Sequence, residues 1–191
     1  MKAFWLCFVP LFVAVDAIGV LPMFMTLTKE LDDSKIPRVI YQSVLTAVIV
    51  AFVFLLAGRA LLNLLGITVA DFMIAGGILL FVISISEMIS TEKTMRQVDP
   101  ESLGAVPIGV PLITGPAVLT TSIILLDAHG FFITSAAIFI NIVIAGVIFF
   151  FSKYINSLLG KAGAKTFSKI ASLLLASIAV MIIRKGIMTF F

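Results

Sequence analysis

Charged residues are scarce in this chain of 191 residues. Asp, Glu, Lys and Arg make up 12% of the sequence and apolar residues make up 61%. An average soluble domain carries about a quarter of charged residues and about half of apolar ones. A water-soluble fold of ordinary composition is therefore excluded.

Cysteine and histidine are almost absent as well. Cys7 is the single cysteine, so no disulfide can form within the chain, and its apolar neighbours indicate an inert packing residue. His129 is the single histidine, and neither His-Glu-x-x-His nor Gly-x-Ser-x-Gly occurs. We therefore expect no enzyme, no cofactor and no metal site. Basic residues do not cluster with exposed aromatic residues, so nucleic acid is not an expected partner.

Long runs without any charge are what the sequence has instead. Residues 39–58, 102–126 and 130–152 form runs of 20, 25 and 23 residues. At about 1.5 Å per residue, each run as a helix crosses the roughly 30 Å of a bilayer's hydrocarbon core. The runs are apolar on all sides and lack the alternation of a membrane β-barrel. A bundle of transmembrane helices is predicted.

Six spans fit the length, and they form a single all-α transmembrane domain over residues 1–191. A cleavable signal peptide at the N-terminus is the less favoured alternative, because the chain stays apolar through Met25. The predicted spans are 4–28, 38–57, 66–89, 105–126, 131–152 and 167–190.

The basic residues predict the orientation of the six spans. Nine Lys and Arg residues fall on the side that carries the 29–38, 90–104 and 153–166 loops, and four fall on the side of the two termini. Positive residues accumulate on the cytoplasmic side of membrane proteins. Both termini are therefore expected outside the cytoplasm.

A weak internal repeat divides the chain into two halves of three helices each, residues 1–95 and 102–191. Val-Pro-Leu-Phe at 9–12 recurs as Val-Pro-Leu-Ile at 110–113, and Ile-Ala-Gly at 74–76 is echoed by Ile-Ala-Ser at 170–172. Three crossings place the second half in the opposite orientation. This inverted arrangement is common among secondary transporters.

The first helix of each half is predicted to break near the bilayer midplane. Residues 16–22 and 111–116 lie at the centres of their spans and carry Gly and Pro. Both residue types destabilise a helix interior. Plain kinks are the alternative, because Gly and Pro are common in membrane helices, but two breaks at matching depth favour a binding site.

A break creates a free helix N-terminus, which favours an anion such as a carboxylate. Asp16 is expected to cap the half-helix that follows the first break. Thr114 or Gly115 is expected to cap the half-helix that follows the second break, and Pro116 is expected at the first position of that half-helix. A carboxylate at mid-membrane costs about 3 kcal/mol and is usually functional. Asp16 is therefore assigned to capping, to a substrate ammonium group, or to a coupling proton or Na⁺. The alternative is a protonated side chain bonded to freed backbone.

Further polar or small residues lie at similar depth in the other helices. Asn141 is the strongest of these candidates, and packing or hydrogen bonding between helices is the alternative role for each. The predicted substrate-binding residues are Asp16, Ala17, Gly19, Thr46, Gly76, Thr114, Gly115, Pro116 and Asn141.

Three motifs in order resemble the MarC-like family of membrane proteins over nearly the whole chain. The family pattern Asp-Pro-Ile-Gly-Asn-Leu-Pro appears at 16–22 with Ala17 and Val20 in place of the Pro and Asn. Ala-Gly-Gly appears at 75–77, and Pro-Leu-x-x-Gly-Pro at 111–116.

The resemblance implies a six-helix secondary transporter in a prokaryotic inner membrane, with glycine or alanine as the type of substrate and an ion as the coupled partner. The residues themselves suit a small zwitterionic amino acid, since two half-helix ends and Asp16 offer donors and an acceptor. A passive channel or pore is the main alternative, and a structural scaffold is another. The oligomeric state and the direction of transport do not follow from the sequence.

Overall fold

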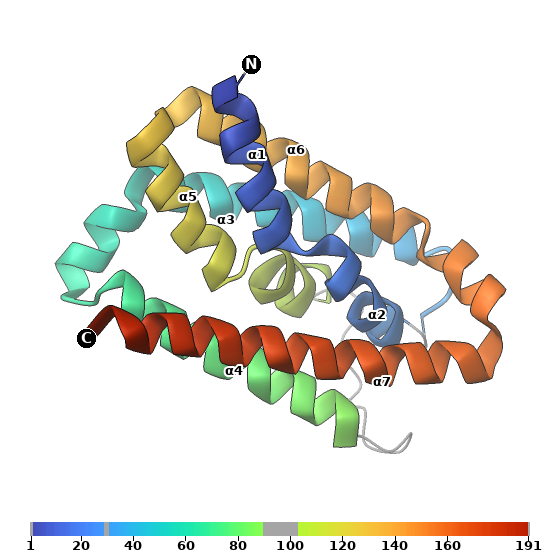
Figure 1. The fold of residues 1–191 in the computed structure, drawn as a ribbon. Coiled ribbons are helices and arrows are strands. Elements are labelled where there is room, and N and C mark those ends of the chain that lie inside the picture. Colours follow the sequence, from blue (N-terminus) through green and yellow to red (C-terminus); the bar gives the residue numbers. More distant parts are fainter. Residues whose placement is uncertain (1, 29–30, 90–102, 191) are drawn as a thin grey trace.

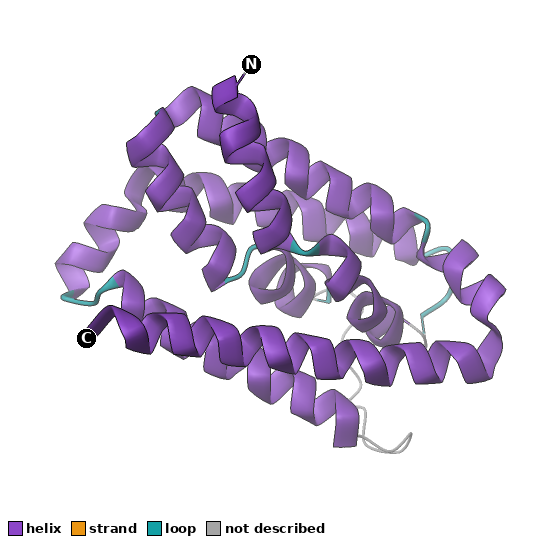
Figure 2. Ribbon diagram, in the orientation of Figure 1, coloured by secondary structure: helices purple, strands orange, loops and turns teal. Residues whose placement is uncertain are grey.

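The computed structural model describes residues 2–28, 31–89 and 103–190 (Figure 1). All regular structure in these residues is helical, as Figure 2 shows, so the predicted all-α fold is confirmed. The elements in chain order are α1 (Lys2–Val15), α2 (Ala17–Thr28), α3 (Ile36–Leu65), α4 (Val69–Ile89), η1 (Gly104–Ile113), α5 (Pro116–His129), α6 (Phe131–Phe150), α7 (Ser152–Ile187) and η2 (Met188–Phe190).

Five helical stretches are long and apolar enough to cross a membrane. Segments η1 and α5 form a sixth span when they are counted together, and they are bent by 55° where they meet. The five stretches are Lys2–Thr28, Ile36–Leu65, Val69–Ser86, Phe131–Phe150 and Ser172–Phe190. These stretches overlap the predicted spans, and their boundaries differ as follows.

Two predicted boundaries were wrong. The second span was expected to end at residue 57, but α3 continues to Leu65, because the chain after Arg59 is rich in strong helix formers such as Ala and Leu. Gly66 then ends the helix with φ of 67°, and the Ile67 N–H donates to the Leu62 carbonyl at 3.0 Å. Residues 153–166 were expected to form a loop and instead belong to the continuous helix α7.

The two broken helices pack into the centre of the bundle. Helices α1 and α2 both contact α6, and α2 also contacts α7; η1 lies on α3, and α5 contacts α1, α3, α4 and α6. Helices α4 and α7 form a long antiparallel pair along one side (Figure 1). Gly77 and Gly186 allow this approach, because a Cβ on either would lie about 3 Å from a carbonyl oxygen of the partner helix.

Segment η1 is an irregular helical segment that lies directly on the backbone of α3. A Cβ at Gly104 would lie 2.7 Å from the Val39 carbonyl oxygen, and a Cβ at Gly109 would lie 3.1 Å from that of Ser43. Thr114 follows at the same spacing of five residues, and its hydroxyl donates to the Ala47 carbonyl at 3.1 Å. The glycines at this spacing therefore allow the two backbones to touch.

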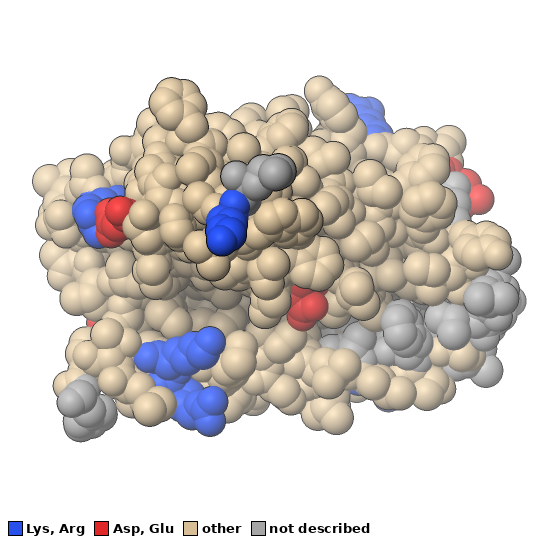
Figure 3. All heavy atoms as spheres, turned by 45° about the horizontal axis from the view of Figure 1, so that its top comes forward, with Lys and Arg blue, Asp and Glu red and all other residues tan. Residues whose placement is uncertain are grey.

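Much of the outer surface of the described residues is apolar. Lys, Arg, Asp and Glu occupy only isolated patches of the face in Figure 3. Large apolar side chains point outward, among them Leu56 (72% exposed), Leu64 (83%) and Phe132 (86%). Such a surface suits lipid tails, so the lipid bilayer is the environment that the fold requires.

Candidate functional site

The first break is a single residue, Asp16, between α1 and α2. Its φ is 44°, in the left-handed region, and no other non-glycine residue in the described ranges has a positive φ. Asp tolerates this conformation better than most residues do. Backbone hydrogen bonds continue on both sides, since the Asp16 N–H donates to the Phe12 carbonyl at 3.1 Å and the Val20 N–H donates to the Asp16 carbonyl at 2.9 Å. The break is thus one residue wide, and α1 and α2 together still form one membrane-spanning stretch, Lys2–Thr28.

The Asp16 carboxylate caps the start of α2, as predicted. Its Oδ1 accepts a hydrogen bond from the Gly19 N–H at 3.2 Å. A Cβ at residue 19 would lie 2.3 Å from Asp16 Oδ2, so glycine leaves the space that the carboxylate occupies. The predicted interruption over 16–22 is therefore narrower than expected. Because the cap restarts the helix at once, Gly19 and Pro22 are helical.

The second break lies at Thr114 and Gly115, between η1 and α5. Gly115 is extended, with φ of −85° and ψ of 177°, and Pro116 occupies the first turn of α5. Of the two predicted capping residues, Gly115 is the N-cap residue, whereas the Thr114 hydroxyl is used on α3. No side chain caps the start of α5, so no side chain accepts hydrogen bonds from the first backbone N–H groups of that helix.

Gly76 of α4 and Pro116 of α5 are brought into direct contact. A Cβ at residue 76 would lie 1.7 Å from Pro116 Cγ, which is a complete steric overlap. The absence of a side chain at Gly76 therefore leaves the space that the Pro116 ring occupies at the second break. Two residues that the sequence assigns to one site meet here, although they are 40 residues apart in the chain.

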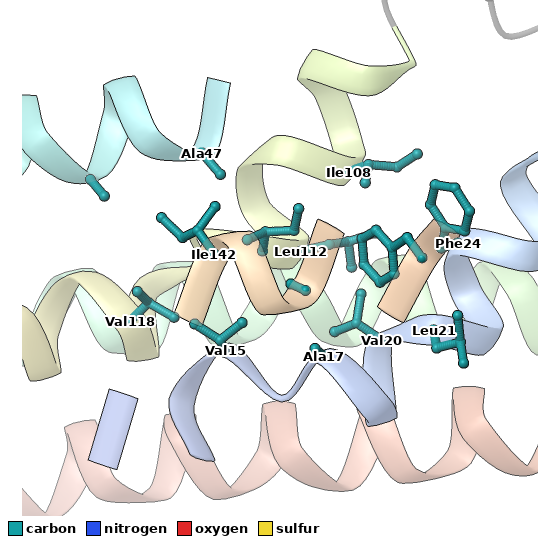
Figure 4. Packing of buried hydrophobic residues seen from close by; sticks show 14 of the residues in the cluster. Val15, Ala17, Val20, Leu21, Phe24, Ala47, Ile108, Leu112, Val118 and Ile142 are labelled. Atoms are coloured by element: carbon teal, nitrogen blue, oxygen red, sulfur yellow. The ribbon is translucent and has the colours of Figure 1, made fainter. Parts of the chain in front are cut away.

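The two breaks face one buried cluster in the core of the bundle. Val15 and Ala17 flank the first break, Leu112 and Val118 flank the second, and all four side chains belong to that cluster (Figure 4). Helix α1 packs on α5 and α2 packs on η1. The helices on either side of the two breaks are therefore in contact, and apolar side chains are buried beside both breaks.

Asn141 is buried on α6 and ties that helix to α1. Its Nδ2 donates to the Phe8 carbonyl at 3.2 Å and to the Ala137 carbonyl at 2.9 Å. The side chain is 1% exposed, and its Oδ1 has no hydrogen-bond partner. A buried acceptor without a donor is unfavourable unless a ligand or water satisfies it. Among the predicted site residues, Asn141 is the one with a buried hydrogen-bond acceptor that has no donor.

Thr46 lies on α3 next to Ala47, whose carbonyl accepts the hydrogen bond from Thr114 at the second break. It is half-buried on α3 and faces Gly109 of η1, where a Cβ added to the glycine would lie 3.0 Å from Thr46 Cβ. The contact that Thr46 makes with η1 is therefore one of helix packing.

Two charged interactions were missed by the sequence analysis. Arg59 of α3 and Asp127 of α5 form an ion pair across 68 residues of sequence. Asp71 forms a reciprocal cap with Thr68 at the start of α4: the Thr68 N–H donates to Asp71 Oδ2 at 2.8 Å and the Asp71 N–H donates to Thr68 Oγ1 at 3.1 Å. The Thr-x-x-Asp spacing was the available signal for the second. No local sequence pattern indicated the ion pair between Arg59 and Asp127.

Two further features lie outside the candidate site. No group of three His, Cys, Asp or Glu residues that would hold a metal ion occurs in the described parts of the chain. An apolar groove near the start of α3 contains none of the predicted site residues, since its lining is Ile36, Pro37, Ile40, Phe150, Phe151 and Tyr154.

The fold and the paired breaks define a multi-pass α-helical integral membrane protein. The model of the MarC family of integral membrane proteins matches residues 1–191, so the chain belongs to that family.

Relatives resemble the chain along almost its full length. A UPF0056 membrane protein of Archaeoglobus fulgidus is 29% identical over 98% of this chain and 93% of its own. One from Methanocaldococcus jannaschii is 32% identical over 94% of this chain and 84% of its own. One from Buchnera aphidicola subsp. Schizaphis graminum is 31% identical over 96% of this chain and 91% of its own. No solved structure matches the chain.

Proposed function

We propose that this protein is an ion-coupled secondary transporter of small neutral amino acids of the glycine and alanine type. The observation that carries the proposal is the packing of two interrupted helices on one another in the buried core, α1 on α5 and α2 on η1. Broken helices that meet inside a membrane bundle are the usual setting of a transporter's substrate site.

The residues at the breaks suit the two charges of a zwitterion. The uncapped start of α5 offers backbone N–H groups to a carboxylate. The half-buried Asp16 carboxylate is an acceptor for an ammonium group. A second buried acceptor, the unpartnered Oδ1 of Asn141, lies near Phe8, eight residues before Asp16 on α1. The surrounding Val, Leu and Ile side chains provide no partner for a charged substrate side chain, which favours glycine and alanine.

Alternating access follows from the packing between the breaks. Val15, Ala17, Leu112 and Val118 are buried beside the breaks, where we place the solute. Binding then requires the two halves of the chain, 1–95 and 102–191, to move relative to one another. We assign the coupling ion, a proton or Na⁺, to Asp16, because its carboxylate lies at the first break.

Flux of radiolabelled glycine and alanine in sealed proteoliposomes tests the proposal. Saturable uptake with counterflow is expected, and it should be lost in Asp16→Asn and in Gly115→Leu. Unchanged flux in both variants would contradict the assigned site. Conductance steps without saturation would identify a channel instead. A pH gradient and a Na⁺ gradient, imposed separately, identify the coupled ion.

A further inference from the structure

The two ends of the bundle are closed by contacts of different chemistry. We call the end where α1 begins and α7 ends the terminal end, and the other the opposite end. Helix α5 leads from the second break toward the terminal end, and α2 leads from the first break toward the opposite end (Figure 1). Each of these half-helices is joined near its far end to a long helix of the other half.

The closure at the terminal end is an ion pair at the surface of the protein. Arg59 of α3 is ion-paired with Asp127 of α5, and the two side chains are 63% and 47% exposed. An exposed ion pair that water can reach contributes little to stability and separates easily.

The closure at the opposite end is a buried apolar contact. Phe24 of α2 stacks on Phe149 of α6 with ring centroids 4.5 Å apart and planes inclined by 11°. Both side chains are 0% exposed, and Phe24 is seen within the core cluster in Figure 4. Separating these rings exposes apolar surface and removes an aromatic contact, so this closure resists opening more strongly.

We infer that Arg59 and Asp127 form the gate of the terminal end, and that Phe24 and Phe149 form the gate of the opposite end. This inference rests on the proposed alternating access. Both gates are shut in this structure, and the ion pair is the one that opens more readily. A solute therefore reaches the breaks first from the terminal end.

The gate can be tested without any substrate. In a Cys7→Ser background, Thr120→Cys places one thiol on α5, one turn beyond the second break, at a position that is 6% exposed. A membrane-impermeant thiol reagent is added on the terminal side of sealed vesicles, and the labelling rate is measured. Arg59→Ala and Asp127→Ala should each raise the rate about two- to fivefold, the range that an exposed ion pair allows.

Controls separate a gate from a general loosening of the fold. The exchange of charges, Arg59→Asp with Asp127→Arg, should restore the slow rate. Arg184→Ala removes another exposed arginine near the terminal end and should leave the rate unchanged. Phe149→Leu should instead raise labelling from the opposite side.

The outcomes distinguish this inference from the proposed function. Equal labelling in the parent and both alanine variants, or no recovery on charge exchange, would overturn the gate even if glycine is transported. Faster labelling in a protein that moves no amino acid would support the gate and overturn the proposed substrate.

Discussion

The Asp16 carboxylate occupies the space that a Cβ of residue 19 would fill, and it accepts a hydrogen bond from the Gly19 N–H at 3.2 Å. Two residues of one motif therefore act as a unit: the acid caps the half-helix, and the glycine makes the cap possible. This relationship explains why a helix can stop and restart within one residue at the centre of a membrane span.

The Asp16 cap should give non-additive changes in stability. Asp16→Ala and Gly19→Ala each remove the same hydrogen bond, so each should lower the free energy of unfolding by about 1 kcal/mol. The double variant should lose little more than either single one. Asp16→Asn should retain the cap. Thermal unfolding in detergent measures all four variants, and additive losses would show that the two residues act independently.

The contact between Gly76 and Pro116 should make residue 76 intolerant of any side chain. Gly76→Ala places a methyl group inside the proline ring and should cost about 1–3 kcal/mol of stability. Adding Pro116→Ala should recover part of the loss, because the ring is then gone. Ala75→Val, at the adjacent exposed position, is the matched control and should change stability by less than about 0.5 kcal/mol. Equal losses at 75 and 76 would contradict the contact.

Thr114 should stabilise the second break through its hydroxyl. Thr114→Val keeps the shape but removes the hydrogen bond to the Ala47 carbonyl, and it should cost about 1 kcal/mol. Thr114→Ser retains the donor and should preserve the hydrogen bond. The measurement is the unfolding midpoint of each purified variant, and a valine variant as stable as the parent would show that the bond contributes nothing.

Asn141 should matter for both packing and ligand binding. Asn141→Leu removes the tie to the Phe8 carbonyl and the unpartnered oxygen together, so it should lower stability by about 1 kcal/mol and abolish any thermal shift caused by glycine. Ser177→Ala is the matched control, because Ser177 is exposed and its hydroxyl donates to the Leu173 carbonyl of its own helix. A glycine-dependent shift that survives in Asn141→Leu would remove this residue from the site.

The charge bias predicts where single cysteines react in intact cells. In a Cys7→Ser background, Lys2→Cys and Lys185→Cys should react with an impermeant thiol reagent from outside, and Lys35→Cys should not. Labelling of the opposite set would reverse the predicted orientation of the chain.

Local features were predictable from the sequence, and contacts between distant residues were not. The span positions and both breaks follow from charge-free runs and from Gly and Pro, whose effects act within a turn or two of helix. The Arg59–Asp127 pair and the Asn141–Phe8 hydrogen bond join residues 68 and 133 positions apart, so no local pattern indicates them. The predicted end of the second span was wrong because a single charge at Arg59 does not stop a helix whose following residues favour it.

The amino-acid sequence by itself determined that this chain enters a membrane, how many times it can cross, and where its first and fourth spans weaken. Long apolar segments inside a bilayer must satisfy their backbone hydrogen bonds internally, and helices do so. The tertiary structure alone decided which breaks meet, why residue 76 must lack a side chain, and which contacts close each end of the bundle. Those outcomes depend on how closely separate helices approach, and that distance is set by the side chains of both partners at once.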